Sequence, residues 1–246
     1  MLQKKWFENW FDSPYYHILY QNRNDEEAEL FIDNLCTYLK PSLNAMLLDA
    51  ACGRGRHAVY LNKKGYHVTG IDLSPSNIEF AQRFKNKELH FQVHDIRHIF
   101  QKNSFDIALN LFTSFGYFET NEEHISTLQA LQKSLKDNGL LVLDYFNTEK
   151  IMRHLSHQEI KHLDGIDFHI NKQIRDGKIV KRISFEHRDT KHVFEEEIKA
   201  FTYSDFENLF AQSGFKIIKH FGDYSLNDFD YTHSDRLIFI CQKTHA

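Results

Sequence analysis

A tight glycine turn between two acidic residues is the part of this sequence best suited to chemistry. Asp49 ends an apolar run, Gly53 and Gly55 follow it, and Asp72 ends the next apolar run. Glycines let the backbone bend sharply and approach a ligand without an intervening Cβ. A carboxylate at the tip of the second strand can accept hydrogen bonds from both ribose hydroxyls of an adenosine. The spacing therefore predicts a site for an adenosine-containing ligand.

These groups converge only if the chain folds as strand, turn, helix and strand. Residues 46–50 and 67–71 are apolar runs that predict buried strands. Residues 58–61 are compatible with a helix, which Gly65 would end. The first N–H groups of such a helix have no intrahelical partner, so they would face a ligand above the turn.

The motif separates two classes of cofactor. A nicotinamide-binding Gly-x-Gly-x-x-Gly fingerprint requires a third glycine, and Ala58 occupies that position. Residues 49–55 instead form the pattern Asp-x-Ala-x-Gly-x-Gly, which resembles motif I of the class I S-adenosylmethionine-dependent methyltransferases. Ala51 stands where many members have glycine. The resemblance covers residues 40–150 and 200–242 and implies S-adenosylmethionine as the cofactor; the alternative is an α/β turn that binds no cofactor.

The resemblance also implies which residues hold each part of the cofactor. In the family, the turn and the first acid hold the methionine part, the second acid holds the ribose, and an acid after the third strand meets the adenine amino group. The alternative for that third acid is a helix cap. Carried over onto this chain, the expected cofactor set is Asp49, Ala51, Gly53, Gly55, Asp72, Leu73, Asp95, Ile96 and Asn110.

Residues 6–20 form an N-terminal arm that is rich in aromatic side chains. We give equal weight to two roles for this arm, permanent packing against the core and a lid over the cofactor mouth. A lid would exclude water from a reaction that depends on alignment. Tyr16 is expected to lie nearest the bound ligands, and we add it to the cofactor set.

Residues 105–110 predict the fourth strand, and residues 111–118 follow it. In the family this segment is motif IV, where transfer takes place. Enzymes that methylate base amino groups often carry Asn-Pro-Pro-Tyr or Asp-Pro-Pro-Tyr there, whereas this chain has Asn-Leu-Phe-Thr. That difference disfavours DNA as the substrate. Aromatic walls suit a cationic sulfonium. The candidate acceptor-pocket residues are Phe115, Tyr117, Tyr145, Asn147 and His187, and we select no catalytic base among them.

Alternating strand and helix patterns predict an α/β fold. We expect a doubly wound, Rossmann-like sheet of seven strands with an antiparallel last strand, preceded by N-terminal helices. Residues 1–150 and 201–246 would form this core together with the arm, and residues 151–200 would form an insertion. Period-2 alternation around a turn at residues 175–178 predicts that the insertion is a three-stranded antiparallel sheet.

Composition excludes several classes of protein. The 246 residues carry a net charge of −4 and no long basic run, which argues against binding nucleic acid through a broadly basic surface. No segment approaches the ~20 apolar residues of a membrane span, and the N-terminus lacks the apolar core of a secretory signal. Three separated cysteines favour a reducing cytosol. We therefore expect a cytoplasmic protein without a metal. The sequence leaves open whether it is a monomer or a homodimer.

The leading hypothesis is a methyltransferase that uses S-adenosylmethionine and a small-molecule acceptor, with in-line displacement at the methyl group. One alternative is a protein that binds S-adenosylmethionine without transferring its methyl group. Others are a methyltransferase acting on protein or RNA, and a nicotinamide oxidoreductase, which the missing third glycine disfavours.

Overall fold

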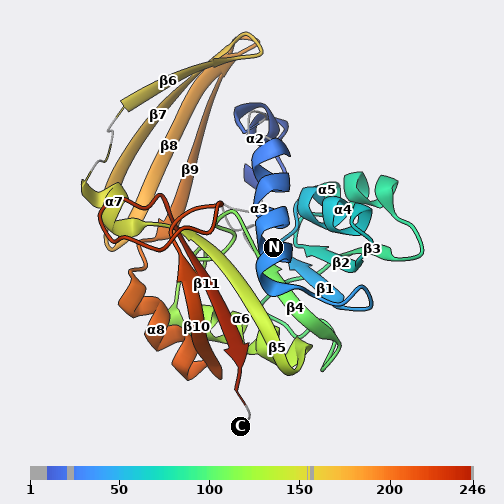
Figure 1. Cartoon of the computed structure of the whole chain (residues 1–246). Helices are drawn as coiled ribbons and strands as arrows, with labels where there is room; N and C mark the ends of the chain where they lie inside the picture. Colours follow the sequence, from blue (N-terminus) through green and yellow to red (C-terminus); the bar gives the residue numbers. More distant parts are fainter. Residues whose placement is uncertain (1–9, 21–24, 154, 156–157, 245–246) are drawn as a thin grey trace.

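A twisted sheet of seven strands forms the centre of the structure (Figure 1). The computed structural model describes residues 10–20, 25–153, 155 and 158–244. The strand order is β10-β11-β5-β4-β1-β2-β3, and β11 is antiparallel to both of its neighbours. This arrangement confirms the predicted core. The strands are β1 (Met46–Ala50), β2 (His67–Asp72), β3 (Leu89–Val93), β4 (Phe105–Asn110), β5 (Leu135–Phe146), β10 (Phe215–Phe221) and β11 (Arg236–Lys243).

Helices cover both faces of this sheet because successive side chains of a strand point to opposite sides. Leu47 packs in one cluster with α3 (Asp25–Leu39), α4 (Arg56–Lys63) and α5 (Pro75–Ala81). Leu48 and Ala50 pack on the other face with α6 (Asn121–Ser134) and α8 (Tyr203–Gln212). Two further short helices are η1 (Gln82–Phe84), which follows α5, and α7 (Thr148–Arg153), which follows β5.

The strand order reverses between β1 and β4. From β1 the chain adds β2 and β3 on one side, and then returns to place β4 on the other side of β1. In open α/β sheets, ligands bind at the carboxyl ends of the strands where the order reverses. Asp49 is the last residue but one of β1 and Asn110 ends β4, so the predicted motif lies at this position.

The insertion is a four-stranded antiparallel sheet, so the prediction of three strands was wrong. Its strands are β6 (Gln158–Leu163), β7 (Ile166–Arg175), β8 (Lys178–His187) and β9 (Thr190–Lys199). The strand missing from the prediction is β6. It is an edge strand whose side chains are mostly exposed, and Ile160 itself is 54% exposed. Its sequence therefore lacks the alternation of apolar and polar residues that marks a half-buried strand.

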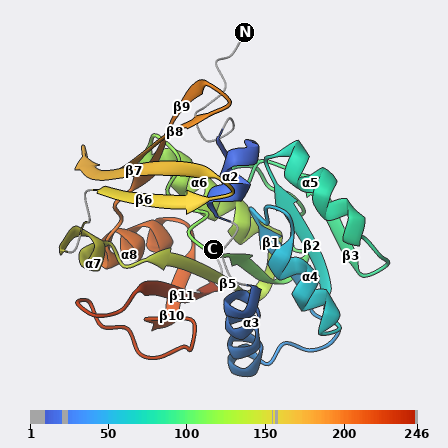
Figure 2. The ribbon, with the colours of Figure 1, turned by 90° about the horizontal axis from the view of Figure 1, so that it is seen from above.

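Residues 10–20 of the N-terminal arm pack against the insertion, and residues 6–9 lie outside the described residues. Trp10 and Leu19 are buried in one cluster with Phe168, Ile183 and Phe185 of β7 and β8. The short helix α2 (Pro14–Leu19) lies between the insertion and the β2–α5 region when the molecule is viewed from above (Figure 2). None of the described helices combines the length and the apolar character needed to cross a membrane.

Candidate functional site

A cavity of about 690 Å³ opens above the glycine turn. It is lined by the turn itself, by the segment after β4 and by the arm. Five of the predicted cofactor residues line it, namely Tyr16, Asp49, Ala51, Gly53 and Asp72. We call this space the first cavity.

Asp49 carries a buried carboxylate on the wall of the first cavity. Only 1% of the residue is exposed, and its Oδ2 has no hydrogen-bond partner among the described residues. Burial raises the pKa of Asp49 to about 7, against the opposing effect of a hydrogen bond from the Ala58 backbone. A buried carboxylate oxygen without a hydrogen-bond partner is costly. The cavity therefore favours a ligand that places a donor or a cation at Oδ2.

Asp72 holds the turn and the next helix together. Its Oδ2 accepts a hydrogen bond from the Gly53 N–H at 2.8 Å, and its Oδ1 accepts one from the Ser74 N–H at 2.9 Å. A carboxylate offers about four acceptor positions, and the Asn77 side chain also donates to Asp72. Asp72 therefore retains capacity for a ligand hydroxyl while it fixes the turn.

The two glycines of the turn serve different purposes. Gly53 has φ +56°, and a Cβ there would meet no protein atom within 4 Å. The open space beside it belongs to the cavity. Gly55 has φ +83°, and a Cβ there would lie 2.6 Å from the Phe91 ring. Gly55 does not line the first cavity, so the structure explains this glycine by packing. Ala51 adopts φ +62°, a conformation usually left to glycine.

Four other predicted cofactor residues also lie outside the cavity lining. The Asp95 carboxylate pairs with Arg97 at 2.6 Å, and Ile96 is a buried core residue. Leu73 packs against the core. Asn110 is fully buried, and its Nδ2 donates to the Ala50 carbonyl at 3.0 Å, which joins the ends of β4 and β1.

A second cavity of about 620 Å³ adjoins the first. Tyr20, Phe112, Thr113 and Tyr117 line both spaces and form the junction between them. Strands β8 and β9 of the insertion form one wall of the second cavity, and the ends of β5 and β11 form another. Its charged lining side chains are Glu27, Lys150, Lys172, Lys181, Glu196, Asp235 and Arg236.

A buried ion pair supports the junction. Asp144 is fully buried, and the Arg236 guanidinium donates to its Oδ1 at 2.8 Å. Arg236 also donates to the Thr113 hydroxyl at 2.8 Å, and the Phe112 N–H donates to Asp144 Oδ2 at 2.7 Å. The ion pair therefore fixes Phe112 and Thr113, two of the residues that line both cavities.

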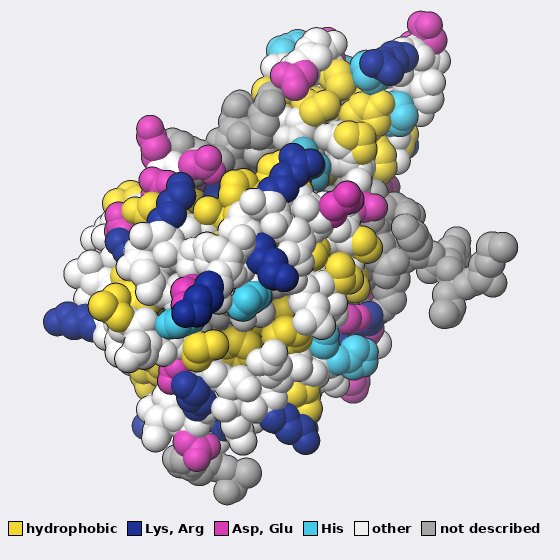
Figure 3. All heavy atoms as spheres, turned by 90° about the vertical axis from the view of Figure 1, so that its right-hand side faces the viewer, with side chains coloured by type: hydrophobic (Ala, Val, Ile, Leu, Met, Phe, Trp, Pro, Cys, Tyr) yellow, Lys and Arg dark blue, Asp and Glu magenta, His cyan; other side chains and the backbone are white. Residues whose placement is uncertain are grey.

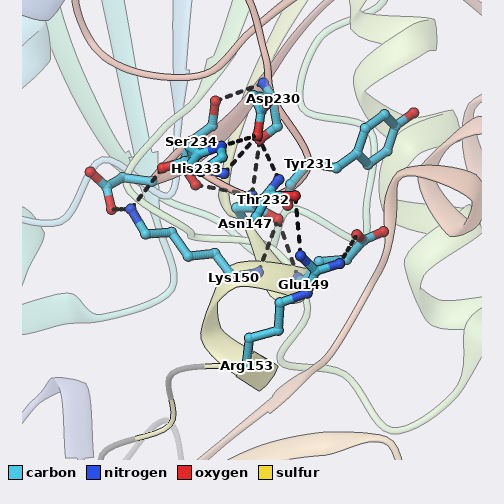
Figure 4. A network of polar contacts seen from close by, with 10 residues as sticks. Asn147, Glu149, Lys150, Arg153, Asp230, Tyr231, Thr232, His233 and Ser234 are labelled. Atoms are coloured by element: carbon cyan, nitrogen blue, oxygen red, sulfur yellow. Dashed lines mark hydrogen bonds and ion pairs between the residues drawn. The ribbon is translucent and has the colours of Figure 1, made fainter.

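Asn147 anchors the loop between β10 and β11. Its Nδ2 donates to the carbonyl oxygens of Tyr231 at 3.0 Å and Ser234 at 2.9 Å (Figure 4). Lys150 of α7 reinforces the contact through the His233 carbonyl and the Asp235 carboxylate. Asn147 lines the second cavity, but its amide is occupied by loop carbonyls.

The other predicted acceptor residues are dispersed. Tyr117 lies at the junction. Phe115 and Tyr145 are fully buried in the core, and the Tyr145 hydroxyl donates to the Lys199 carbonyl. His187 lies at the far end of β8 and interacts with the Tyr15 hydroxyl. Phe115, Tyr145 and His187 line neither cavity.

Of the residues that line the second cavity, the sequence predicted only Tyr117 and Asn147. Tyr20, Glu196 and Arg236 were not singled out. Tyr20 and Glu196 are 176 residues apart, so no local spacing in the sequence identifies them as a pair. Among the described residues, no group of three His, Cys, Asp or Glu side chains could hold a metal ion.

The chain is similar to known methyltransferases in sequence and in fold. A family model described as "Methyltransferase domain" matches residues 47–139. The putative methyltransferase YqeM of Bacillus subtilis is 26% identical over 212 residues, which is 80% of this chain and 84% of that protein. A glycine/sarcosine N-methyltransferase of Parasynechococcus marenigrum is 24% identical, with 99% of this chain and 86% of that protein aligned. A crystal structure of an S-adenosylmethionine-dependent methyltransferase from Clostridium acetobutylicum superposes with a TM-score of 0.80 at 20% identity, covering 94% of this chain and 96% of that one.

Proposed function

Since the chain belongs to the class I S-adenosylmethionine-dependent methyltransferases, we propose that it methylates a small polar molecule bound in the second cavity. The observation that carries this proposal is the pair of adjoining cavities with a shared junction. Small-molecule sites usually measure about 300–1,000 Å³, and the second cavity lies within that range. Its mixed positive and negative lining suits an acceptor with polar or charged groups.

The first cavity fits the cofactor by its chemistry. In this proposal the unpaired Asp49 Oδ2 receives the cofactor's amino group, the open space beside Gly53 receives its methionine part, and Asp72 receives its ribose. When bound, S-adenosylmethionine supplies an electrophilic methyl group whose bond to sulfur breaks as the acceptor's lone pair bonds to carbon. The protein's part is to hold the two molecules in line and to exclude water, and alignment of this kind can be worth ~7–11 kcal/mol.

Replacing Asp72 by Ala should weaken S-adenosylhomocysteine binding by about 1–3 kcal/mol, because the ribose hydroxyls would lose their acceptor. Gly53→Val should weaken it more, because a side chain would fill the cavity and strain a backbone with φ +56°. Calorimetry measures both affinities, and circular dichroism checks that the variants fold. Wild-type affinity in a folded Asp72→Ala protein would contradict the ribose contact.

We propose that the arm acts as a lid as well as a packing element. Tyr16 and Tyr20 line the first cavity, while Asp12 accepts a hydrogen bond from the Ser74 hydroxyl at 2.8 Å, at the start of α5. The arm thus joins the insertion to the β2–α5 region across the cavity mouth. Residues 10–20 should exchange amide hydrogens quickly without ligand and slowly with S-adenosylhomocysteine. Equal protection in both states would leave the arm with a packing role alone.

The alternatives differ in the acceptor. A protein or RNA would have to reach the junction from outside. On the face drawn in Figure 3, lysine and arginine side chains are spread singly among acidic and neutral ones, which does not favour RNA on that face. A panel of amines, amino acids, amino sugars and phenols, assayed for S-adenosylhomocysteine formation, tests the proposal. Methylation of a protein or RNA fraction without turnover of the panel would replace it.

A further inference from the structure

The junction between the two cavities contains a hydroxyl group that is hydrogen-bonded to a carboxylate. Tyr20 lines both cavities, and its hydroxyl lies 2.7 Å from Glu196 Oε1 and 2.9 Å from Oε2. The Tyr20 hydroxyl therefore donates its proton to the Glu196 carboxylate. Glu196 is on β9 of the insertion, and its side chain is only 15% exposed.

A cation accompanies this pair. Lys181 of β8 donates to the Tyr20 oxygen, and its Nζ also lies 4.5 Å from the centroid of the Tyr20 ring. The same ammonium group is 3.5 Å from Glu196 Oε2. A fixed ammonium group stabilises negative charge that develops on the phenol oxygen during proton transfer. Two other hydroxyl groups lie at the junction, those of Thr113 and Tyr117. The Thr113 hydroxyl receives its hydrogen bond from Arg236, which cannot take up a proton.

We propose that Tyr20 and Glu196 form the proton-accepting pair of the reaction. This inference rests on the proposed function. The acceptor's N–H or O–H gives its proton to Tyr20 Oη as the acceptor atom becomes a nucleophile, and the Tyr20 proton passes to the Glu196 carboxylate. The acceptor loses one proton and Glu196 gains one, so the phenol ends as it began. The acceptor is therefore an amine or a hydroxyl compound, whose nucleophilic atom carries a proton at neutral pH.

A purely structural role for Glu196 is the competing explanation, because Glu196 also accepts a hydrogen bond from the Trp10 indole of the arm. The variant Glu196→Gln separates the two. Its amide oxygen can still accept hydrogen bonds from Tyr20 and Trp10, but it cannot take up a proton at neutral pH. Tyr20→Phe keeps the ring and removes the hydroxyl.

Matched controls exist on the same two elements. Tyr15→Phe makes the same change in the arm at a hydroxyl that contacts His187 and His192 instead of a cavity. Glu195→Gln makes the same change one residue along β9, at a side chain that is 40% exposed and pairs with Arg175. Neither control residue lines either cavity.

The experiment measures kcat and KM for the acceptor found in the panel of amines, amino acids, amino sugars and phenols, together with S-adenosylhomocysteine affinity. Tyr20→Phe and Glu196→Gln should each lower kcat by about 10²- to 10⁴-fold, with little change in KM or in S-adenosylhomocysteine affinity. The double variant should be no slower than the slower single variant, because groups that act as a unit are not additive. Both controls should retain wild-type kcat.

Each of the following results would overturn the inference. Wild-type kcat in Glu196→Gln would assign Glu196 to holding the arm. An equal loss in the Tyr15 and Glu195 controls would assign the effect to the packing of the arm. Wild-type protein that turns over none of the probes would overturn the proposed function, and this inference with it. Active wild-type protein with fully active Tyr20→Phe and Glu196→Gln variants would overturn the inference alone.

Discussion

Asp49→Asn is expected to weaken S-adenosylhomocysteine binding by about 10- to 100-fold at pH 8 and much less at pH 6. A hydrogen bond to a charged group is worth about 1.5–3 kcal/mol, and 1.4 kcal/mol corresponds to tenfold in affinity. The difference between pH values arises because burial raises the pKa of Asp49 to about 7. At pH 6 most wild-type molecules carry a protonated Asp49, which resembles the amide of the variant.

The pH dependence of the wild type should follow the same carboxyl group. Binding of an ammonium group requires the ionised form, so affinity should fall by up to about tenfold per pH unit below 7. Calorimetry at several pH values measures this slope, and in Asp49→Asn the slope should be largely removed. A wild-type affinity independent of pH between 6 and 8 would show that Asp49 does not meet the cofactor's charge.

Asp49 should also destabilise the ligand-free protein. An unfolded aspartate loses its proton near pH 3.8, whereas folded Asp49 retains it up to about pH 7. Folding therefore disfavours the ionised form. The free energy of unfolding falls as pH rises from 4 to 7, and this loss is complete above pH 7. Asp49→Asn should consequently raise the Tm of the ligand-free protein at pH 8 while it impairs binding. Opposite effects on stability and affinity mark a group retained for function.

The cofactor turn could be predicted from the sequence because its chemistry is local. Asp49, Gly53 and Asp72 lie at the ends of adjacent strands, and the backbone alone brings them to one edge of the sheet. Their spacing in the chain therefore fixes their arrangement in space. The same reasoning gave the parallel core, whose strands are nearly continuous apolar runs.

The acceptor side could not be predicted in this way. Tyr145 follows Asp144 near the end of β5, and its direction is set by packing against Phe201 and Phe206 in the core rather than by its position at a strand end. His187 is the last residue of β8, and this strand carries it away from the junction to the Tyr15 hydroxyl. Tyr20 and Glu196 meet only because the arm docks on the insertion. Such contacts depend on how separate elements are assembled.

Replacing Arg236 by Leu is expected to lower the free energy of unfolding by about 3–5 kcal/mol, because it leaves the Asp144 carboxylate buried without its cation. Asp144 is fully buried, and burial raises its pKa even while Arg236 acts in the opposite direction. Removing Arg236 should raise that pKa further. The loss of stability should therefore be larger at pH 8, where the carboxyl group must ionise, than at pH 5.

A double variant tests whether the cost comes from the uncompensated charge. Arg236→Leu with Asp144→Asn removes the cation and the anion together, while the Asn oxygen can still accept the hydrogen bond from the Phe112 N–H. Urea unfolding should show the double variant to be more stable than Arg236→Leu alone at pH 8, with less dependence on pH. If Arg236→Leu costs less than about 1 kcal/mol, which is typical of exposed pairs, then water reaches Asp144 and the ion pair does not hold the junction. A large loss of stability that the second substitution reverses would instead confirm that the junction between the two cavities depends on this charge pair.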